Sequence, residues 1–234
     1  MHHSGKPGHA ARQLRLHTFF SAAFPVGAFA YSHGLEAAIA NEQIIDRDTC
    51  HDCIVQIIRY GSVWNDALLL CEAHRLIGDG EHYEQKDLRS INELALALCA
   101  SRERYQETTQ LGQAFANACA CWAQSQHPAV AALEPDIALP VAVGMIGALH
   151  RFELAELLPI AMQAACSNLV WIVSRLLPMG QSESLSIIHD LETTLTEAAF
   201  QAQSASLNDL GSCTLLIDLA SIAHESLPTR ICVS

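Results

Sequence analysis

Hydrophobic side chains recur three and four residues apart along most of this chain, which is the spacing of helices that bury one face. One example begins at Asp46 or Asp48, either of which can cap a helix. The apolar positions that follow are Cys53, Ile54, Ile57 and Ile58. β-Branched runs are few. The pattern predicts an all-α fold: a single-domain bundle of roughly eight to ten helices with a proline- and glycine-containing connector near the N-terminus.

The same spacing predicts where the helices lie. Breaks are expected at Gly61, around residues 78–80 and in a loop over residues 127–135, which holds two prolines. Ser101 either caps a new helix or lies inside a continuing one. The expected helices cover residues 35–41, 46–60, 63–77, 87–100, 101–122, 139–149, 152–177, 182–202 and 210–224.

Residues 24–36, which we call the connector, hold a proline, two glycines and three aromatic residues. This segment is either a buried cap on the core or a functional loop. Proline fixes its own φ, and glycine can take the positive φ that a turn demands. A second turn after residue 177 offers another such glycine. The expected structural turn residues are Pro25, Gly27, Gly34, Pro178 and Gly180.

Two further features concern packing within the helices. Gly144 and Gly147 are three residues apart in an apolar helix, where small residues allow close helix contact. Pro159 is expected near a helix start or at a kink.

The ends of the chain differ from its middle. Residues 1–13 contain two glycines and a proline and are expected to form a flexible tail. Residues 14–225 are interpreted as a single all-helical domain. Pro228 stops the last helix, and residues 226–234, the C-terminal segment, are expected to be irregular.

Composition narrows the class of protein. Hydrophobic residues make up 50% of the 234 positions and charged residues 16%, enough apolar sequence for a sizeable core. The formal net charge is −12 and the 13 basic residues are scattered, which argues against nucleic-acid binding. The longest uncharged run, residues 157–174, contains polar side chains and favours a buried helix over a membrane span. Nine cysteines without a disulfide pattern and no secretory signal indicate the cytoplasm.

The sequence offers no enzyme template. It lacks a P-loop, a dinucleotide-binding glycine pattern and a nucleophile elbow. Cys50 and Cys53 form one CxxC, but a structural zinc site usually needs a second pair. We therefore expect no enzymatic activity, no catalytic residues, no metal site and no firmly bound cofactor.

Four segments of the chain resemble the urease accessory protein UreF family. The connector, FPVGAFAYSHGLE, is similar to the family signature. The others are residues 101–104 with Gly112, residues 139–144 with Asn168 and 175–181, and residues 224–225 with Arg230. Where family members end in a tail with tyrosine, phenylalanine and a second arginine, this chain lacks all three and has Pro228.

The resemblance implies a non-enzymatic, all-helical assembly factor. Such proteins dimerise, bind the accessory protein UreD (also called UreH), and together with it recruit the GTPase UreG to apo-urease for nickel insertion. Nickel and GTP would be handled by the assembled complex.

On this interpretation, five residues are expected to bind partners: Phe29, Tyr31, Ser32, Glu36 and Arg230. Phe29 and Tyr31 are expected to be exposed anchors, and the C-terminal segment is expected to order on binding UreD.

Two other classes stay open. Twelve histidines and nine cysteines leave room for a stand-alone nickel carrier. A helical hydrolase whose site assembles only in three dimensions is the other.

Overall fold

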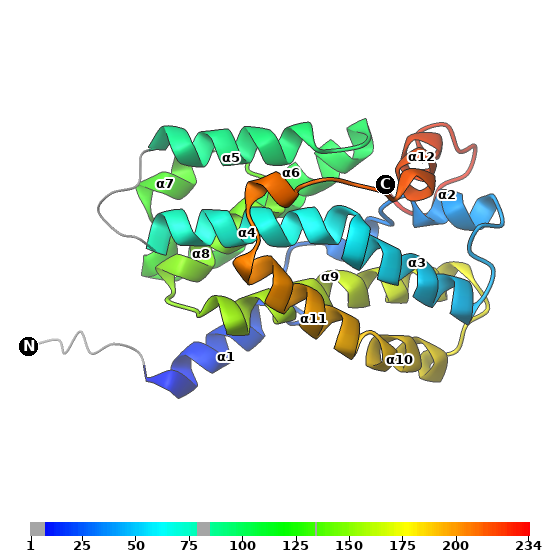
Figure 1. Ribbon diagram of the computed structural model, residues 1–234, viewed down its shortest axis with the longest axis horizontal. Coiled ribbons are helices and arrows are strands. Elements are labelled where there is room, and N and C mark those ends of the chain that lie inside the picture. The colour runs from blue at the N-terminus through cyan, green and yellow to red at the C-terminus, as the bar shows by residue number, and fades with distance from the viewer. Residues whose placement is uncertain (1–7, 79–84, 134) are drawn as a thin grey trace, which may run out of the picture.

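The computed structural model describes residues 8–78, 85–133 and 135–234. This part of the chain contains α-helices and short 3₁₀ helices (η) and no strand (Figure 1), which confirms the all-α prediction. All α-helices except α2 and α7 span ten residues or more. The elements are α1 (His9–Phe19), η1 (Ala28–Ala30), α2 (Leu35–Ala40), α3 (Arg47–Tyr60), α4 (Ser62–Gly78), α5 (Gln85–Ala97), α6 (Arg102–Cys119), η2 (Ala123–Ser125), α7 (Pro128–Ala131), α8 (Leu139–Leu149), α9 (Leu154–Leu176), α10 (Gln181–Asp190), α11 (Glu192–Ser204), η3 (Leu207–Asp209) and α12 (Leu215–His224).

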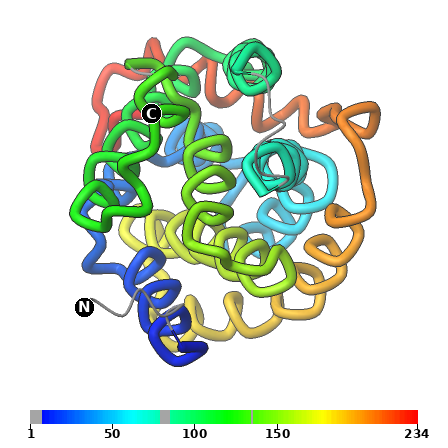
Figure 2. Tube along the Cα trace, turned by 90° about the vertical axis from the view of Figure 1, so that its left-hand side faces the viewer, coloured from blue at the N-terminus to red at the C-terminus, as the bar shows by residue number. Residues whose placement is uncertain are grey.

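The centre of the bundle is α8, which packs mainly against α4 and α6 (Figures 1 and 2). Most of its residues are buried, as its nearly uniform apolar sequence requires. A Cβ on Gly144 would lie 2.3 Å from the carbonyl oxygen of Leu70 on α4, so only glycine permits this crossing. The predicted close approach at Gly144 is therefore confirmed. One hydrophobic cluster joins side chains from α1 through α12.

Two predicted helix starts are confirmed by their caps. The Asp46 carboxylate accepts a hydrogen bond from the Thr49 N–H at 2.9 Å and begins α3. The Ser101 hydroxyl accepts one from the Arg104 N–H at 3.1 Å, so α6 is a new helix rather than a continuation of α5. Each cap satisfies a backbone donor that has no partner inside its helix.

Several predicted boundaries were wrong. Helix α1 begins at His9, inside the expected tail. Leu16 and Phe19 bury one face of this helix, and Ala10 and Ala11 favour its extension toward the N-terminus. Residues 1–7 lie outside the described part. The expected loop over residues 127–135 contains α7, which has Pro128 at its first turn, where proline is tolerated. The expected helix over residues 182–202 is divided at Leu191, which is buried between α10 and α11.

Two other predicted helix and turn features also differ. Helix α12 starts at Leu215, five residues later than expected, because residues 210–214 form an irregular segment whose Cys213 N–H bonds the carbonyl of Tyr60. Gly180 has φ −75°, so the expected positive φ is wrong. Its N–H donates to the Glu183 carboxylate at 2.7 Å and begins α10, which needs no left-handed conformation. Pro159 lies inside α9, near its start.

Helix α9 is long and apolar enough to cross a membrane by length and composition. The same properties suit a core helix, and α9 packs against α3, α4, α10 and α11. Its buried residues, among them Leu157, Leu158, Val170 and Val173, belong to the hydrophobic cluster.

The α4–α8 crossing gives a stability prediction. Gly144→Ala should lower the free energy of unfolding by about 1–3 kcal/mol, because the new methyl group meets rigid backbone. Gly147→Ala is the matched control, since its Cβ would meet the movable end of the Leu157 side chain and should cost less. Urea unfolding followed by circular dichroism measures both. Equal losses, or no loss at Gly144, would contradict this account of the crossing.

Candidate functional site

Both ends of the connector are held by contacts with other helices, α1 at one end and α12 at the other. Phe24 is buried and lies 5.5 Å from the ring of Phe19 on α1. Gly27 has φ 78° and begins η1, which confirms the predicted turn. Gly34 has φ 82°, and a Cβ there would lie 2.7 Å from the backbone nitrogen of Ser221 on α12. Glycine is therefore required at position 34 for both backbone conformation and space.

Helix α9 holds the middle of the connector through its two prominent polar side chains. The Asn168 amide donates to the carbonyl of Ala28 at 2.9 Å, and the Arg175 guanidinium donates to the carbonyl of Phe29 at 2.6 Å. Arg175 is exposed, so its pairing does not depend on full burial. These bonds fix the backbone that presents Phe29.

The C-terminal segment folds back onto the connector. The Val233 N–H donates to the carbonyl of Ala30 at 2.7 Å, and the Ser32 N–H donates to the carbonyl of Ser234 at 2.6 Å. Exposure alternates along the segment, with Ile231 at 71%, Cys232 at 6%, Val233 at 51% and Ser234 at 1%. Its inward residues join the fold and its outward apolar residues face solvent. The segment is irregular in secondary structure but ordered within the chain itself.

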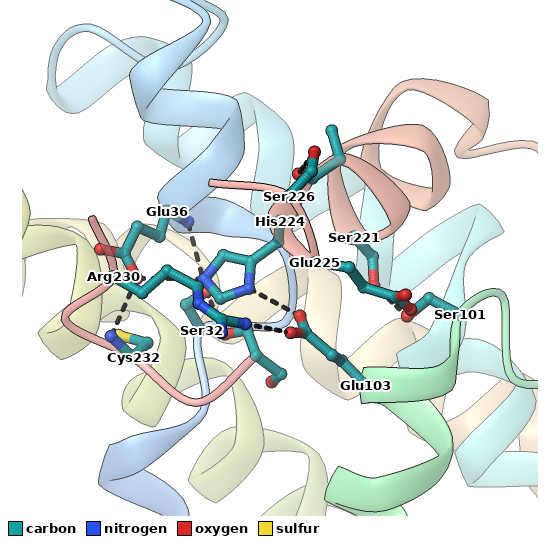
Figure 3. A network of polar contacts seen from close by, with 12 residues as sticks. Ser32, Glu36, Ser101, Glu103, Ser221, His224, Glu225, Ser226, Arg230 and Cys232 are labelled. Atoms are coloured by element: carbon teal, nitrogen blue, oxygen red, sulfur yellow. Dashed lines mark hydrogen bonds and ion pairs between the residues drawn. The ribbon is translucent and has the colours of Figure 1, made fainter. Parts of the chain in front are cut away.

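Glu36, at the start of α2, receives the C-terminal segment (Figure 3). Its carboxylate accepts the Ile231 N–H at 2.7 Å and the Cys232 N–H at 2.9 Å. Burial alone would raise the pKa of Glu36. The hydrogen bonds from Cys232, Ile231 and His224 outweigh burial, so this pKa lies below its ordinary value.

His224, the last residue of α12, is fully buried between two carboxylates. Its Nε2 lies 3.1 Å from Glu36 and its Nδ1 lies 2.6 Å from Glu103 on α6 (Figure 3). Glu103 also accepts a hydrogen bond from the Arg230 guanidinium at 2.7 Å. The cluster of Glu36, Glu103, His224 and Arg230 thus joins α2, α6, α12 and the C-terminal segment.

A second cluster lies one turn further along α6. The Glu107 carboxylate pairs with Arg104 and His33 and accepts the Ser234 hydroxyl at 2.7 Å. Burial would raise the pKa of Glu107, but the Arg104 guanidinium and His33 hold it far below its ordinary value. Burial and Arg104 together lower the pKa of His33. The Tyr31 hydroxyl donates to Gln110 on the same helix.

A cavity of about 60 Å³ adjoins this second cluster and is lined in part by His33, Asp66, Arg104 and Ser221. Burial raises the pKa of Asp66 to about 6, despite the opposing charge of Arg104. Within the described ranges, no group of three or more His, Cys, Asp or Glu residues is placed to hold a metal ion. The charged residues of the two clusters pair with one another and hold separate segments of the chain together.

The five predicted partner-binding residues divide into two groups. Phe29 is 68% exposed, as expected. Tyr31, Ser32 and Glu36 are buried, and Arg230 pairs with Glu103. The expected exposure of Tyr31 is wrong, because its ring packs inward and its hydroxyl has an internal partner. The expectation that the C-terminal segment needs UreD to become ordered is also wrong, because Glu36, Glu107 and the connector supply its hydrogen bonds.

Helix α12 carries an exposed apolar surface that was not predicted from the sequence. Four large side chains there are at least half exposed, at the i, i+1, i+4 and i+7 positions of one helix face: Leu215, Leu216, Leu219 and Ile222. We call this set the α12 face. The helical spacing of these four residues is visible in the sequence, but the same spacing is equally typical of a face buried in the core. The alternating apolar residues 231 and 233 were a second available signal.

Comparison with known proteins identifies the family. The model of the UreF family matches residues 44–192. The Urease accessory protein UreF of Rhodopseudomonas palustris (strain BisA53) is 41% identical over 224 residues, covering 95% of this chain and 93% of the relative. The chain belongs to the UreF family. The protein of the same name from Sinorhizobium medicae (strain WSM419) is 39% identical over 218 residues, covering 93% of this chain and 94% of the relative.

Membership in the UreF family agrees with the expectation of a non-enzymatic protein, since its relatives are named as accessory factors. Residues from the segments that carry the resemblance also take part in the contacts described above. Asn168 and Arg175 bond the connector, Glu103 and Arg104 lie in the charged clusters, and His224 meets the connector at Glu36. Each of the second, third and fourth segments therefore contributes at least one residue to the site around the connector, whereas Gly144 packs α8 against α4.

The buried Glu107 cluster gives a pH-dependent prediction. Glu107→Gln should lower the free energy of unfolding by about 3–5 kcal/mol at pH 7, because it leaves the buried Arg104 without its carboxylate. The pKa of Glu107 is lowered in the folded state, so its contribution is present above 4.5, the ordinary value, and is lost as the pH falls below it. Urea unfolding at pH 7 and in acid should show the two proteins converging in acid.

The control for this prediction is Glu197→Gln. Glu197 pairs with Arg59 at 3.2 Å, and both side chains are substantially exposed. An exposed pair of this kind contributes about 0–1 kcal/mol. A similar loss at both positions, or a Glu107 effect that does not change with pH, would rule out the buried-pair explanation.

Proposed function

We propose that this chain is a urease accessory protein that acts as a non-enzymatic adaptor. It dimerises, binds a UreD/UreH-type accessory protein, and with it recruits a UreG-type GTPase to the urease apoenzyme for nickel insertion. The setting is the cytoplasm, and nickel and GTP are handled by the assembled complex. The names of its relatives and their near-complete coverage support the urease accessory role.

One observation supports the adaptor role most: apolar side chains remain exposed beside a tightly fixed frame. Phe29, Ile231 and Val233 are all at least half exposed and lie on two segments that bond each other. The α12 face adds four more, and α12 packs against α2, which follows the connector. Large exposed apolar side chains gathered in one region are typical of protein–protein contact sites.

Charge and polarity agree with a protein partner. The net charge of −12 favours approach of a basic protein surface and disfavours nucleic acid. Arg175 bonds the carbonyl of Phe29 and Arg230 pairs with Glu103, so both cations have partners within the chain and the large exposed side chains of this surface are apolar.

Co-expression with a UreD-like protein and a UreG-like GTPase, followed by size-exclusion chromatography, tests the adaptor role. The chain should co-elute with both, and alone it should elute as a dimer. Separate elution of all three proteins would refute the adaptor role.

The alternative of a stand-alone nickel carrier has no specific observation in its favour. Equilibrium dialysis of the purified chain with nickel separates the two functions. Stoichiometric binding at micromolar nickel would support the carrier.

Two aromatic residues two positions apart give a sharp prediction. Phe29→Ala should reduce co-elution with the UreD-like partner at least tenfold, with little change in melting temperature, because Phe29 is 68% exposed. Tyr31→Ala should lower the free energy of unfolding by about 3–5 kcal/mol, because it empties a buried position. Thermal melts and titration of partner capture measure the two effects. A stable Tyr31→Ala variant, or unchanged capture by Phe29→Ala, would contradict the assignment of roles.

The α12 face is tested by a charge introduced at its centre. Leu219→Asp should abolish partner capture, because a carboxylate would be desolvated in the contact. Leu185→Asp is the matched control, since Leu185 is exposed to a similar degree on α10, which lies well apart from α12 (Figure 1). Helical content should be unchanged in both. Equal capture by the two variants would place the partner elsewhere.

A further inference from the structure

His224 has an unusual environment for a histidine. Both of its ring nitrogens face carboxylate oxygens, Nδ1 at 2.6 Å from Glu103 and Nε2 at 3.1 Å from Glu36. A neutral imidazole carries one N–H, so one nitrogen would then point a lone pair at a carboxylate. Because the ring is fully buried, no solvent relieves that repulsion. The geometry points to an imidazolium that donates from both nitrogens.

The charges of the surrounding groups agree with this protonation state. Glu36 and Glu103 carry two negative charges, and Arg230 supplies one positive charge. A positive His224 makes the cluster neutral, whereas a neutral ring would leave a net buried negative charge, which is costly. The neighbouring Glu225 points elsewhere, since its carboxylate accepts the Arg102 N–H at 3.1 Å.

The same cluster holds the C-terminal segment. Glu36 uses its two oxygens to accept the N–H groups of Ile231 and Cys232, and Glu103 binds Arg230. Without a positive charge between them, Glu36 and Glu103 would repel each other across the site that the segment occupies. His224 therefore affects the segment without touching the exposed side chains.

We infer that His224 is a buried imidazolium that latches residues 230–234 onto the connector and thereby positions the exposed apolar side chains of both segments for a partner. The partner part of this inference rests on the proposed adaptor function; the latch does not. His224 is a positioning residue, and it acts through Glu36 and Glu103.

Hydrogen exchange of the Ile231 and Cys232 amides tests the latch, because these are the groups that Glu36 accepts. In the full-length chain, His224→Gln should raise their exchange rates about tenfold to a hundredfold, since hydrogen bonds to a charged group are lost. His189→Gln is the control: His189 is an exposed histidine on α10, and its loss should leave both rates unchanged. Unchanged rates in His224→Gln would overturn the latch.

A double variant separates a charge latch from simple loss of a buried side chain. In Glu103→Gln with His224→Gln, the remaining charges of Glu36 and Arg230 balance, and the two amides can bond each other. The double variant should restore slow exchange to within a few-fold of wild type, even if His224→Gln alone folds poorly. Equally fast exchange in the double variant would overturn the inference.

Nitrogen NMR of the His224 ring in the wild-type chain gives a direct reading at neutral pH. Two protonated nitrogens are expected, and one bare nitrogen would overturn the inference. Partner capture is measured on the same variants by size-exclusion chromatography. If exchange responds as expected but capture does not, the latch stands and the proposed location of the partner site fails.

Discussion

The buried carboxylate of Glu36 is the constraint on which the candidate site depends. A carboxylate removed from water must be met by donors or by positive charge. Here two backbone N–H groups come from residues 231 and 232, and a ring nitrogen comes from His224. All three donors are 188 or more residues away from Glu36 in the sequence. The start of α2, the end of α12 and the C-terminal segment therefore form one structural unit.

That unit explains how a helical protein without catalytic chemistry presents a defined surface. Charged side chains fix this unit through partners within the chain: the exposed Arg175 bonds a connector carbonyl, and Arg230 pairs with the buried Glu103. Large apolar side chains remain exposed on the connector, the C-terminal segment and α12. A pre-formed apolar surface binds at a lower entropic cost than a disordered tail that must fold on its partner. This arrangement suits the adaptor role proposed for this member of the UreF family.

Local patterns predicted the helices well, because apolar spacing, Asp46, Ser101 and the glycine at 144 act on nearby backbone or on one helix contact. They could not give the contacts of the C-terminal segment, since nothing around Glu36 shows that its donors lie at residues 231 and 232. The burial of Tyr31 and the exposure of the α12 face could not be predicted for a related reason. Spacing identifies an apolar face but not what covers it. The alternation of residues 231–234 was the one local sign that this segment is held in place.

The most direct test of this account is hydrogen exchange of the unmodified chain, first alone and then with the proposed UreD-like partner. The account predicts that the Ile231 and Cys232 amides are already protected in the free chain, and that partner binding adds protection mainly over α12. Rapid exchange at residues 231 and 232 in the free chain, slowed only when the partner binds, would contradict it. That result would show that the partner, rather than Glu36 and His224, orders the C-terminal segment.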